Sequence, residues 1–154
     1  MTAFELTSGA FQNGGTIPPD FTCSGKNESP PLAWSGAPTK TKSLVLVCED
    51  PDSSGGHFIH WILYNIPFNA VALPKGIPKK PVTVDGMRHG MNSYGRMEYG
   101  GPCPPPGKPH RYIFRLTALD TELALNAPVT REVLNKAIAG HALGETELMG
   151  KFGR

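Results

Sequence analysis

The sequence predicts a mainly β fold, and three observations indicate it. Glycine and proline are abundant, with 18 and 16 among 154 residues, and they are spread along the whole chain. The apolar segments between them are short, as in strands joined by turns. Only residues 130–140 have helical spacing. We therefore expect one domain, spanning residues 1–154, built as a β-sandwich or a related β fold with a peripheral helix.

A continuous apolar run predicts the central strand. Residues 43–48 read Ser-Leu-Val-Leu-Val-Cys and are followed by Glu49-Asp50-Pro51. A run without alternation is typical of a strand that is buried on both faces. Residues 58–66 predict a second strand, which Pro67 ends. Residues 32–34 and 146–152 are weaker candidates for strands.

Alternation is clearest in residues 110–119. One face carries His110, Tyr112, Phe114, Leu116 and Ala118. The other face carries Arg111, Ile113, Arg115, Thr117 and Leu119. Because side chains alternate across a strand, the first row is expected to face the core.

The helical segment has both of its ends marked. Its apolar residues are Val133, Leu134, Ala137 and Ile138. Thr130 precedes them as a candidate N-cap, and Gly140 follows them as a candidate C′ residue. We expect this short amphipathic helix to pack on the sheet.

Charge and hydrophobicity exclude several classes of protein. The formal net charge is +2, and the basic residues are scattered, so no nucleic-acid-binding stripe is expected. No apolar run has the length of a membrane span, which is about 20 residues. The first residues lack the basic and apolar regions of a signal peptide. These features predict a cytoplasmic protein.

The three cysteines do not have the pattern of a metal-binding or disulfide-rich fold. Cys23, Cys48 and Cys103 are odd in number and contain no Cys-x-x-Cys pair, which argues against a zinc ribbon or a disulfide-rich scaffold. Cys48 lies in the apolar run and is expected to be buried. Cys23 and Cys103 lie in predicted loops, and the sequence leaves open whether they pair.

Polar residues gather at the ends of the predicted strands. Asp50 and Asp52 directly follow the central strand; taken alone, they are read as a capped turn. His60 lies in the second strand, on the face of Ile62, Tyr64 and Ile66 by simple alternation; alone, it is read as a core histidine. His57 falls on the opposite face and is the weaker candidate.

His110 and Tyr112 begin the core-facing row of the alternating strand. Buried imidazole and phenol groups need partners, which structural bonds or water can supply. Together with the aspartates and His60, they would also line a cleft for a small charged ligand. Aspartates near the imidazoles favour imidazolium, which attracts a phosphate-like anion.

Residues 100–109, Gly-Gly-Pro-Cys-Pro-Pro-Pro-Gly-Lys-Pro, immediately precede that strand. Proline fixes φ and lowers the entropy lost when a loop is ordered. This loop is therefore suited to holding backbone N–H groups, around Gly101, beside an anion.

These motifs resemble the phosphatidylethanolamine-binding protein family, also called Raf-kinase-inhibitor-like, and in particular its short bacterial and archaeal branch. The resemblance rests on Asp-Pro-Asp at 50–52, His-Trp at 60–61, Gly-Gly-Pro-Cys-Pro-Pro at 100–105 and His-Arg-Tyr at 110–112. Ser-Pro-Pro-Leu-Ala-Trp at 29–34 adds to it, so that nearly the whole chain is covered.

The resemblance implies an antiparallel Greek-key β-sandwich with one or two short peripheral helices. It implies a non-catalytic protein, without a cofactor, whose pocket accepts phosphate, phosphorylethanolamine or a phosphorylated partner. The pocket residues that match by position are Asp50, Asp52, His60, Gly101, His110 and Tyr112. Inhibition of a kinase or a protease is implied as a possible role, and so is a homodimer.

One departure from the family pattern concerns a pocket wall. Family members usually carry a proline two residues after the second aspartate, where this chain has Ser54 in the run Ser-Ser-Gly-Gly at 53–56. We expect a looser turn there.

An enzyme is the alternative. Asp50, Asp52, His60 and His110 are residue types that hold divalent metals, so a metal-dependent or other hydrolase is the competing hypothesis. The sequence contains neither His-Glu-x-x-His nor Gly-x-Ser-x-Gly, and it has no phosphate-binding loop. We therefore favour binding without catalysis.

Overall fold

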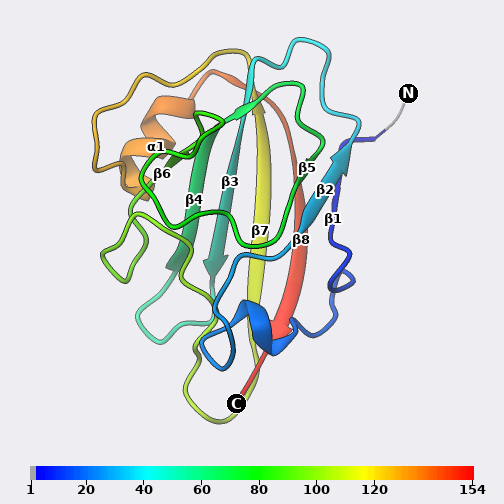
Figure 1. The fold of residues 1–154 in the computed structure, drawn as a ribbon, viewed down its shortest axis with the longest axis vertical. Coiled ribbons are helices and arrows are strands. Elements are labelled where there is room, and N and C mark those ends of the chain that lie inside the picture. The colour runs from blue at the N-terminus through cyan, green and yellow to red at the C-terminus, as the bar shows by residue number, and fades with distance from the viewer. Residues whose placement is uncertain (1–2) are drawn as a thin grey trace.

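The structure, a computed structural model, describes residues 3–154 (Figure 1). Its elements in chain order are β1 (Glu5–Thr7), the 3-10 helix η1 (Pro19–Phe21), β2 (Leu32–Ser35), β3 (Ser43–Asp50), β4 (Phe58–Pro67), β5 (Ala72–Leu73), β6 (Arg88–His89), β7 (His110–Leu119), α1 (Arg131–Ile138) and β8 (Ala142–Phe152).

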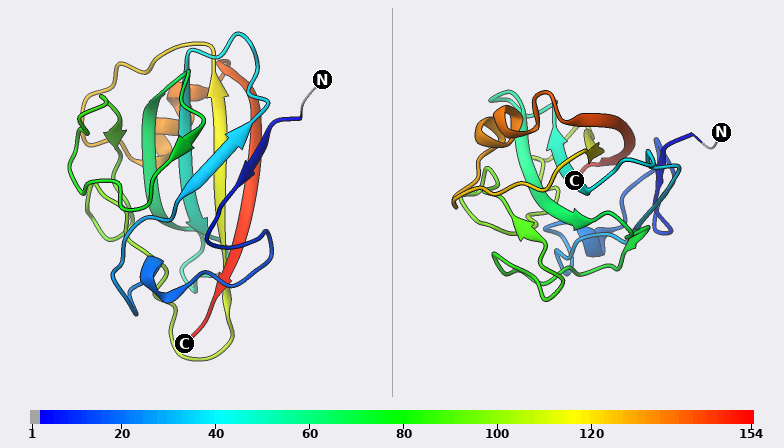
Figure 2. Two further views of the ribbon diagram at one scale, coloured as in Figure 1. Left: turned by 45° about the vertical axis from the view of Figure 1, so that its right-hand side comes forward. Right: turned by 90° about the horizontal axis from the view of Figure 1, so that it is seen from above.

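The strands form two antiparallel sheets, which confirms the predicted mainly β fold. The smaller sheet has the order β1-β2-β5, and the larger has the order β6-β4-β3-β7-β8. Within the larger sheet, β7 returns after a long connection to lie beside β3, so β3, β4, β6 and β7 follow a Greek-key order. The small sheet covers one face of the large sheet, and α1 lies on the other (Figure 2).

Two apolar clusters account for the complete burial of β3. Leu44, Leu46 and Cys48 belong to the core between the two sheets. Val45 and Val47 belong to a second cluster beneath α1, which includes Leu134. Each of the eight residues of β3 is buried, as the unbroken apolar run predicts.

The alternation of β7 is confirmed. Tyr112, Phe114, Leu116 and Ala118 lie in the core between the sheets. β8 pairs with the whole length of β7 and begins at Ala142, four residues before the predicted strand. Its first half is largely exposed, and the edge position beside β7 supplies the pairing that the sequence pattern there does not reveal.

The predicted helix and its N-cap are confirmed. Thr130 Oγ1 accepts a hydrogen bond from the backbone N–H of Val133, at 3.2 Å. Gly140 has φ +81°, a left-handed conformation that glycine adopts without strain after a helix. β1, β5 and β6 were not predicted, because strands of two or three residues are too short to show periodicity.

No helix among residues 3–154 combines the length and the apolar character that crossing a membrane requires.

Candidate functional site

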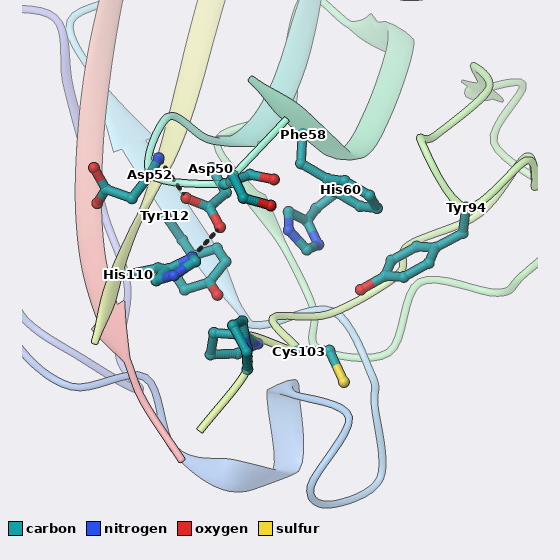
Figure 3. A pocket seen from close by; sticks show the side chains of 12 residues that line it. Asp50, Asp52, Phe58, His60, Tyr94, Cys103, His110 and Tyr112 are labelled. Atoms are coloured by element: carbon teal, nitrogen blue, oxygen red, sulfur yellow. Dashed lines mark hydrogen bonds and ion pairs between the residues drawn. The ribbon is translucent and has the colours of Figure 1, made fainter. Parts of the chain in front are cut away.

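A cavity of about 240 Å³ opens where three strands meet. Because β3 pairs antiparallel with both β4 and β7, the end of β3 adjoins the first residues of those two strands. The residues that line the cavity are Asp50, Asp52, Ser53, Ser54, Phe58, His60, Tyr94, Cys103, Pro104, Pro105, His110 and Tyr112 (Figure 3). Five of the six residues expected from the sequence line it, and Gly101 does not.

Asp50 holds His110 in one orientation. The carboxylate is buried; its Oδ1 accepts the backbone N–H of Asp52 at 2.7 Å, and its Oδ2 lies 2.7 Å from His110 Nδ1 (Figure 3). An ionised carboxylate only accepts hydrogen bonds, so Nδ1 of His110 carries the proton in this pair. His110 Nε2 is then left for a ligand, which it meets as an acceptor in the neutral ring and as a donor in the imidazolium.

Asp52 is bonded to Arg111 at the rim of the cavity. Its carboxylate accepts the backbone N–H of Arg111 at 2.9 Å and two guanidinium N–H groups at 3.0 and 2.8 Å. These hydrogen bonds lower the pKa of Asp52 to about 2. In the view of Figure 3, its carboxylate points away from His60 and Tyr94. Asp52 therefore positions Arg111 and does not organise a histidine.

A β-bulge places His60 in the cavity. Cys48 pairs with Trp61 and Glu49 with Ile59, which leaves His60 as the extra residue of β4. The expectation that His60 shares a face with Ile62 and Tyr64 is wrong, because those two side chains lie on the helix-covered face of the sheet. The bulge turns the His60 ring toward Tyr112, with the ring centroids 5.2 Å apart.

His60 is held as a neutral ring. Its Nδ1 lies 2.7 Å from the carbonyl oxygen of Gly100 and therefore donates to it. Desolvation lowers the pKa of His60 despite the nearby Asp50 carboxylate. This corrects the expectation that aspartates make both pocket histidines cationic. His57 lies outside the cavity, where its Nδ1 is 2.9 Å from Glu49 Oε2.

Tyr112 lines the cavity, and its solvent-inaccessible hydroxyl has no hydrogen-bond partner among the described residues. The residue is fully buried, and desolvation raises the pKa of its phenol, so the group remains a protonated donor at neutral pH. A buried hydroxyl without a protein partner is uncommon, and a water molecule or a ligand atom can satisfy it.

Tyr112→Phe is expected to leave the free energy of unfolding unchanged or to raise it by up to about 1 kcal/mol, because the hydroxyl forms no hydrogen bond within the described chain. Urea unfolding of the protein without ligand measures this. A loss of more than about 1 kcal/mol would show that the hydroxyl has a structural partner after all.

Gly101 lies behind the cavity, against residues 21–27. Its N–H donates to Asn27 Oδ1 at 2.8 Å, and its carbonyl oxygen accepts the Tyr94 hydroxyl at 3.0 Å. A Cβ built on Gly101 would lie 2.5 Å from Asn27 Oδ1 and 2.6 Å from the carbonyl oxygen of Phe21. The N–H expected to cradle an anion is thus already bonded, and Gly101 instead lets the proline-rich loop pack closely.

A disulfide between Cys23 and Cys103 joins this loop to residues 21–27, which answers the pairing question that the sequence left open. Cys23 N–H also donates to the carbonyl oxygen of Pro102 at 3.0 Å. Disulfides persist mainly in oxidising compartments, with hyperthermophile proteins as an exception, so a cytoplasmic location stays a prediction. Cys48 is buried, and the pKa of its thiol is raised by desolvation.

Several lining residues were not predicted from the sequence. Tyr94 comes from the long segment between β6 and β7, and Phe58 packs against it with ring centroids 4.8 Å apart. No periodic signal marks Tyr94. Ser53 and Ser54 line the wall where the family proline is absent. The turn that follows them is closed by a bond from Gly56 N–H to the Ser53 carbonyl oxygen, at 3.0 Å.

The geometry also bears on the metal alternative. Within residues 3–154, His, Cys, Asp and Glu side chains form no group of three or more that could hold a metal ion. The two carboxylates considered for that role are bonded instead to His110 and Arg111.

The chain is similar to a known family and to proteins of other organisms. The family model described as phosphatidylethanolamine-binding protein matches residues 7–153. A UPF0098 protein of Methanothermobacter thermautotrophicus is 44% identical over 150 residues, covering 97% of this chain and 99% of that protein. A UPF0098 protein of Aquifex aeolicus is 41% identical over 152 residues, covering 97% and 88%.

Solved structures give the same result. A crystal structure of a phosphatidylethanolamine-binding protein homologue from Chlamydia trachomatis matches with a TM-score of 0.90 and 40% identity, covering 100% of this chain and 99% of that one. The crystal structure of Escherichia coli YbcL, described as a new member of the mammalian PEBP family, matches with a TM-score of 0.91 and 29% identity, covering 99% of both chains.

Proposed function

This chain belongs to the phosphatidylethanolamine-binding protein family, and we propose that its cavity binds the phosphoryl group of a small molecule or of a phosphorylated partner, without catalysing a reaction. The family fold is that of a binding protein. The specific ligand is inferred from the chemistry of the cavity.

The unpartnered Tyr112 hydroxyl is the observation that carries this proposal. Tyr112 lines the same cavity as His110, whose Nε2 is left free because Asp50 holds the opposite ring nitrogen. An oxyanion accepts hydrogen bonds from both a phenol and an imidazolium. Two donors of this kind suit a phosphoryl oxygen better than a neutral or cationic group.

The size of the cavity supports a small group. Its volume of about 240 Å³ lies below the range of sites for drug-sized ligands, about 300–1,000 Å³. The cavity therefore suits a phosphoryl group and a few further atoms, with the rest of a larger ligand outside. Inhibition of a kinase or a protease would then depend on a phosphorylated or acidic group that a protein partner places here.

The Asp50–His110 pair resembles the acid–base half of a catalytic triad, and Ser53 and Ser54 line the same cavity. A hydrolase would need a nucleophile within hydrogen-bond reach of His110 Nε2. Among the described residues, no hydrogen bond joins either serine hydroxyl to His110. Binding without turnover is therefore the better account.

A titration of the protein with inorganic phosphate and with phosphorylethanolamine, followed by NMR of the imidazole signals, tests the proposal. Signals of His110 should shift, whereas those of His141, paired with Asp120 on an exposed surface, should not.

Two results would contradict the proposal. One is the absence of a shift at His110 with either ligand at millimolar concentration. The other is steady release of phosphate from phosphorylethanolamine by the purified protein, which would indicate an enzyme.

A further inference from the structure

A second groove adjoins the cavity at the beginning of β7. Its volume is about 640 Å³, and it is lined by Asp52, Lys108, Pro109, His110, Arg111 and Lys151. Asp52 and His110 line both hollows, so the groove lies beside the rim of the cavity. A ligand held at His110 can therefore extend into it.

The groove is cationic. Lys108, Arg111 and Lys151 line it, and Asp52 is the only carboxylate among its lining residues. That carboxylate is bonded to Arg111 through two guanidinium nitrogens. Lys108 and Lys151 are exposed, and neither forms an ion pair with a carboxylate in the part of the chain that the structure describes.

The register of β7 and β8 places two of these cations face to face. Arg111 and Lys151 are direct partners in the antiparallel pair. Like charges at opposed positions on neighbouring strands repel each other and destabilise the sheet. Asp52 offsets the charge of Arg111, so the charges that an anion from a ligand would neutralise are those of Lys151 and Lys108.

We propose that the ligand carries a second anionic group, a phosphate or a carboxylate, which binds in this groove on Lys108 and Lys151 while its phosphoryl group occupies the cavity. The inference rests on the proposed function, since it assumes a phosphoryl group at His110. It narrows the ligand class from phosphate monoesters in general to compounds with two anionic groups.

Calorimetric titration with three matched probes tests the proposal. The probes are 4-hydroxybutyl phosphate, which has no second anion, 4-(phosphonooxy)butanoate, which adds a carboxylate, and 1,4-butanediol bisphosphate, which adds a phosphate. Two exposed ion pairs correspond to a gain in affinity of about 2-fold to about 30-fold. The gain should shrink as salt is raised, because these lysines are exposed.

Paired variants assign the gain to the groove. The double variant Lys108→Ala, Lys151→Ala should bind all three probes with equal affinity. The matched control Lys40→Ala, Lys42→Ala removes the same charge from exposed positions before β3, at the opposite end of that strand from Asp50, and should keep the gain.

The outcomes separate the two proposals. If 4-hydroxybutyl phosphate binds the wild-type protein and neither probe with a second anionic group binds more tightly, the second-anion inference is wrong and the proposed function stands. The second-anion inference is also wrong if the gain survives in the groove variant. If no probe binds at millimolar concentration, the proposed function itself fails, and this inference fails with it.

Discussion

His110→Ala is expected to weaken the binding of inorganic phosphate by at least about tenfold at about pH 6. A hydrogen bond to a charged group contributes about 1.5–3 kcal/mol, and 1.4 kcal/mol corresponds to a tenfold change in Kd. The substitution also leaves the buried Asp50 carboxylate without its hydrogen-bond partner His110, so that its charge repels the incoming anion. Calorimetric titration of folded protein measures the loss.

Two further variants show whether the effect comes from Nε2. His110→Asn keeps an N–H donor within reach of Asp50 but lacks Nε2. It should therefore fold, and it should bind phosphate as weakly as His110→Ala does. His141→Ala removes a comparable histidine–aspartate pair, with Nδ1 and Asp120 Oδ1 2.8 Å apart, and should bind phosphate as the wild-type protein does. Unchanged affinity in His110→Asn would place the anion elsewhere.

Gly101→Ala is expected to lower the free energy of unfolding by about 2–4 kcal/mol, because overpacking is combined with the loss of a hydrogen bond. The new Cβ would meet Asn27 Oδ1 at 2.5 Å and the backbone of Phe21 and Thr22 at 2.6 and 3.0 Å. Backbone atoms cannot turn aside as a flexible side chain does. Here they are also tied to the loop by the disulfide of Cys23.

Urea unfolding with the disulfide intact measures this effect. Gly9→Ala is the matched control, because no atom lies within 4 Å of a Cβ built there, and its unfolding free energy should change by less than about 0.5 kcal/mol. If Gly101→Ala is as stable as Gly9→Ala, the loop can move away from Asn27, and the close packing at Gly101 does not constrain it. Phosphate affinity of the folded variant should also fall, since the loop carries Pro104 and Pro105 into the cavity wall.

Local sequence patterns predict the orientation of some cavity residues and not of others. Alternation places Tyr112 toward the core because the pairing of the strand is regular from His110 to Ala118. The same rule fails for His60, because the bulge opposite Cys48 and Glu49 adds a residue and reverses the faces on either side of it. A bulge is a property of two strands, so the sequence of one strand does not reveal it.

Sequence patterns alone determined the strands β3, β4 and β7, the capped helix α1 and the gathering of Asp50, His110 and Tyr112 at one end of the sheet. These features follow from local periodicity, capping and chain order. Tertiary structure alone decided that Asn27 accepts a hydrogen bond from the N–H of Gly101, that Tyr94 lines the cavity and that Cys23 forms a disulfide with Cys103. These contacts join residues far apart in the chain through irregular loops, whose conformations are fixed by packing and not by any repeating pattern.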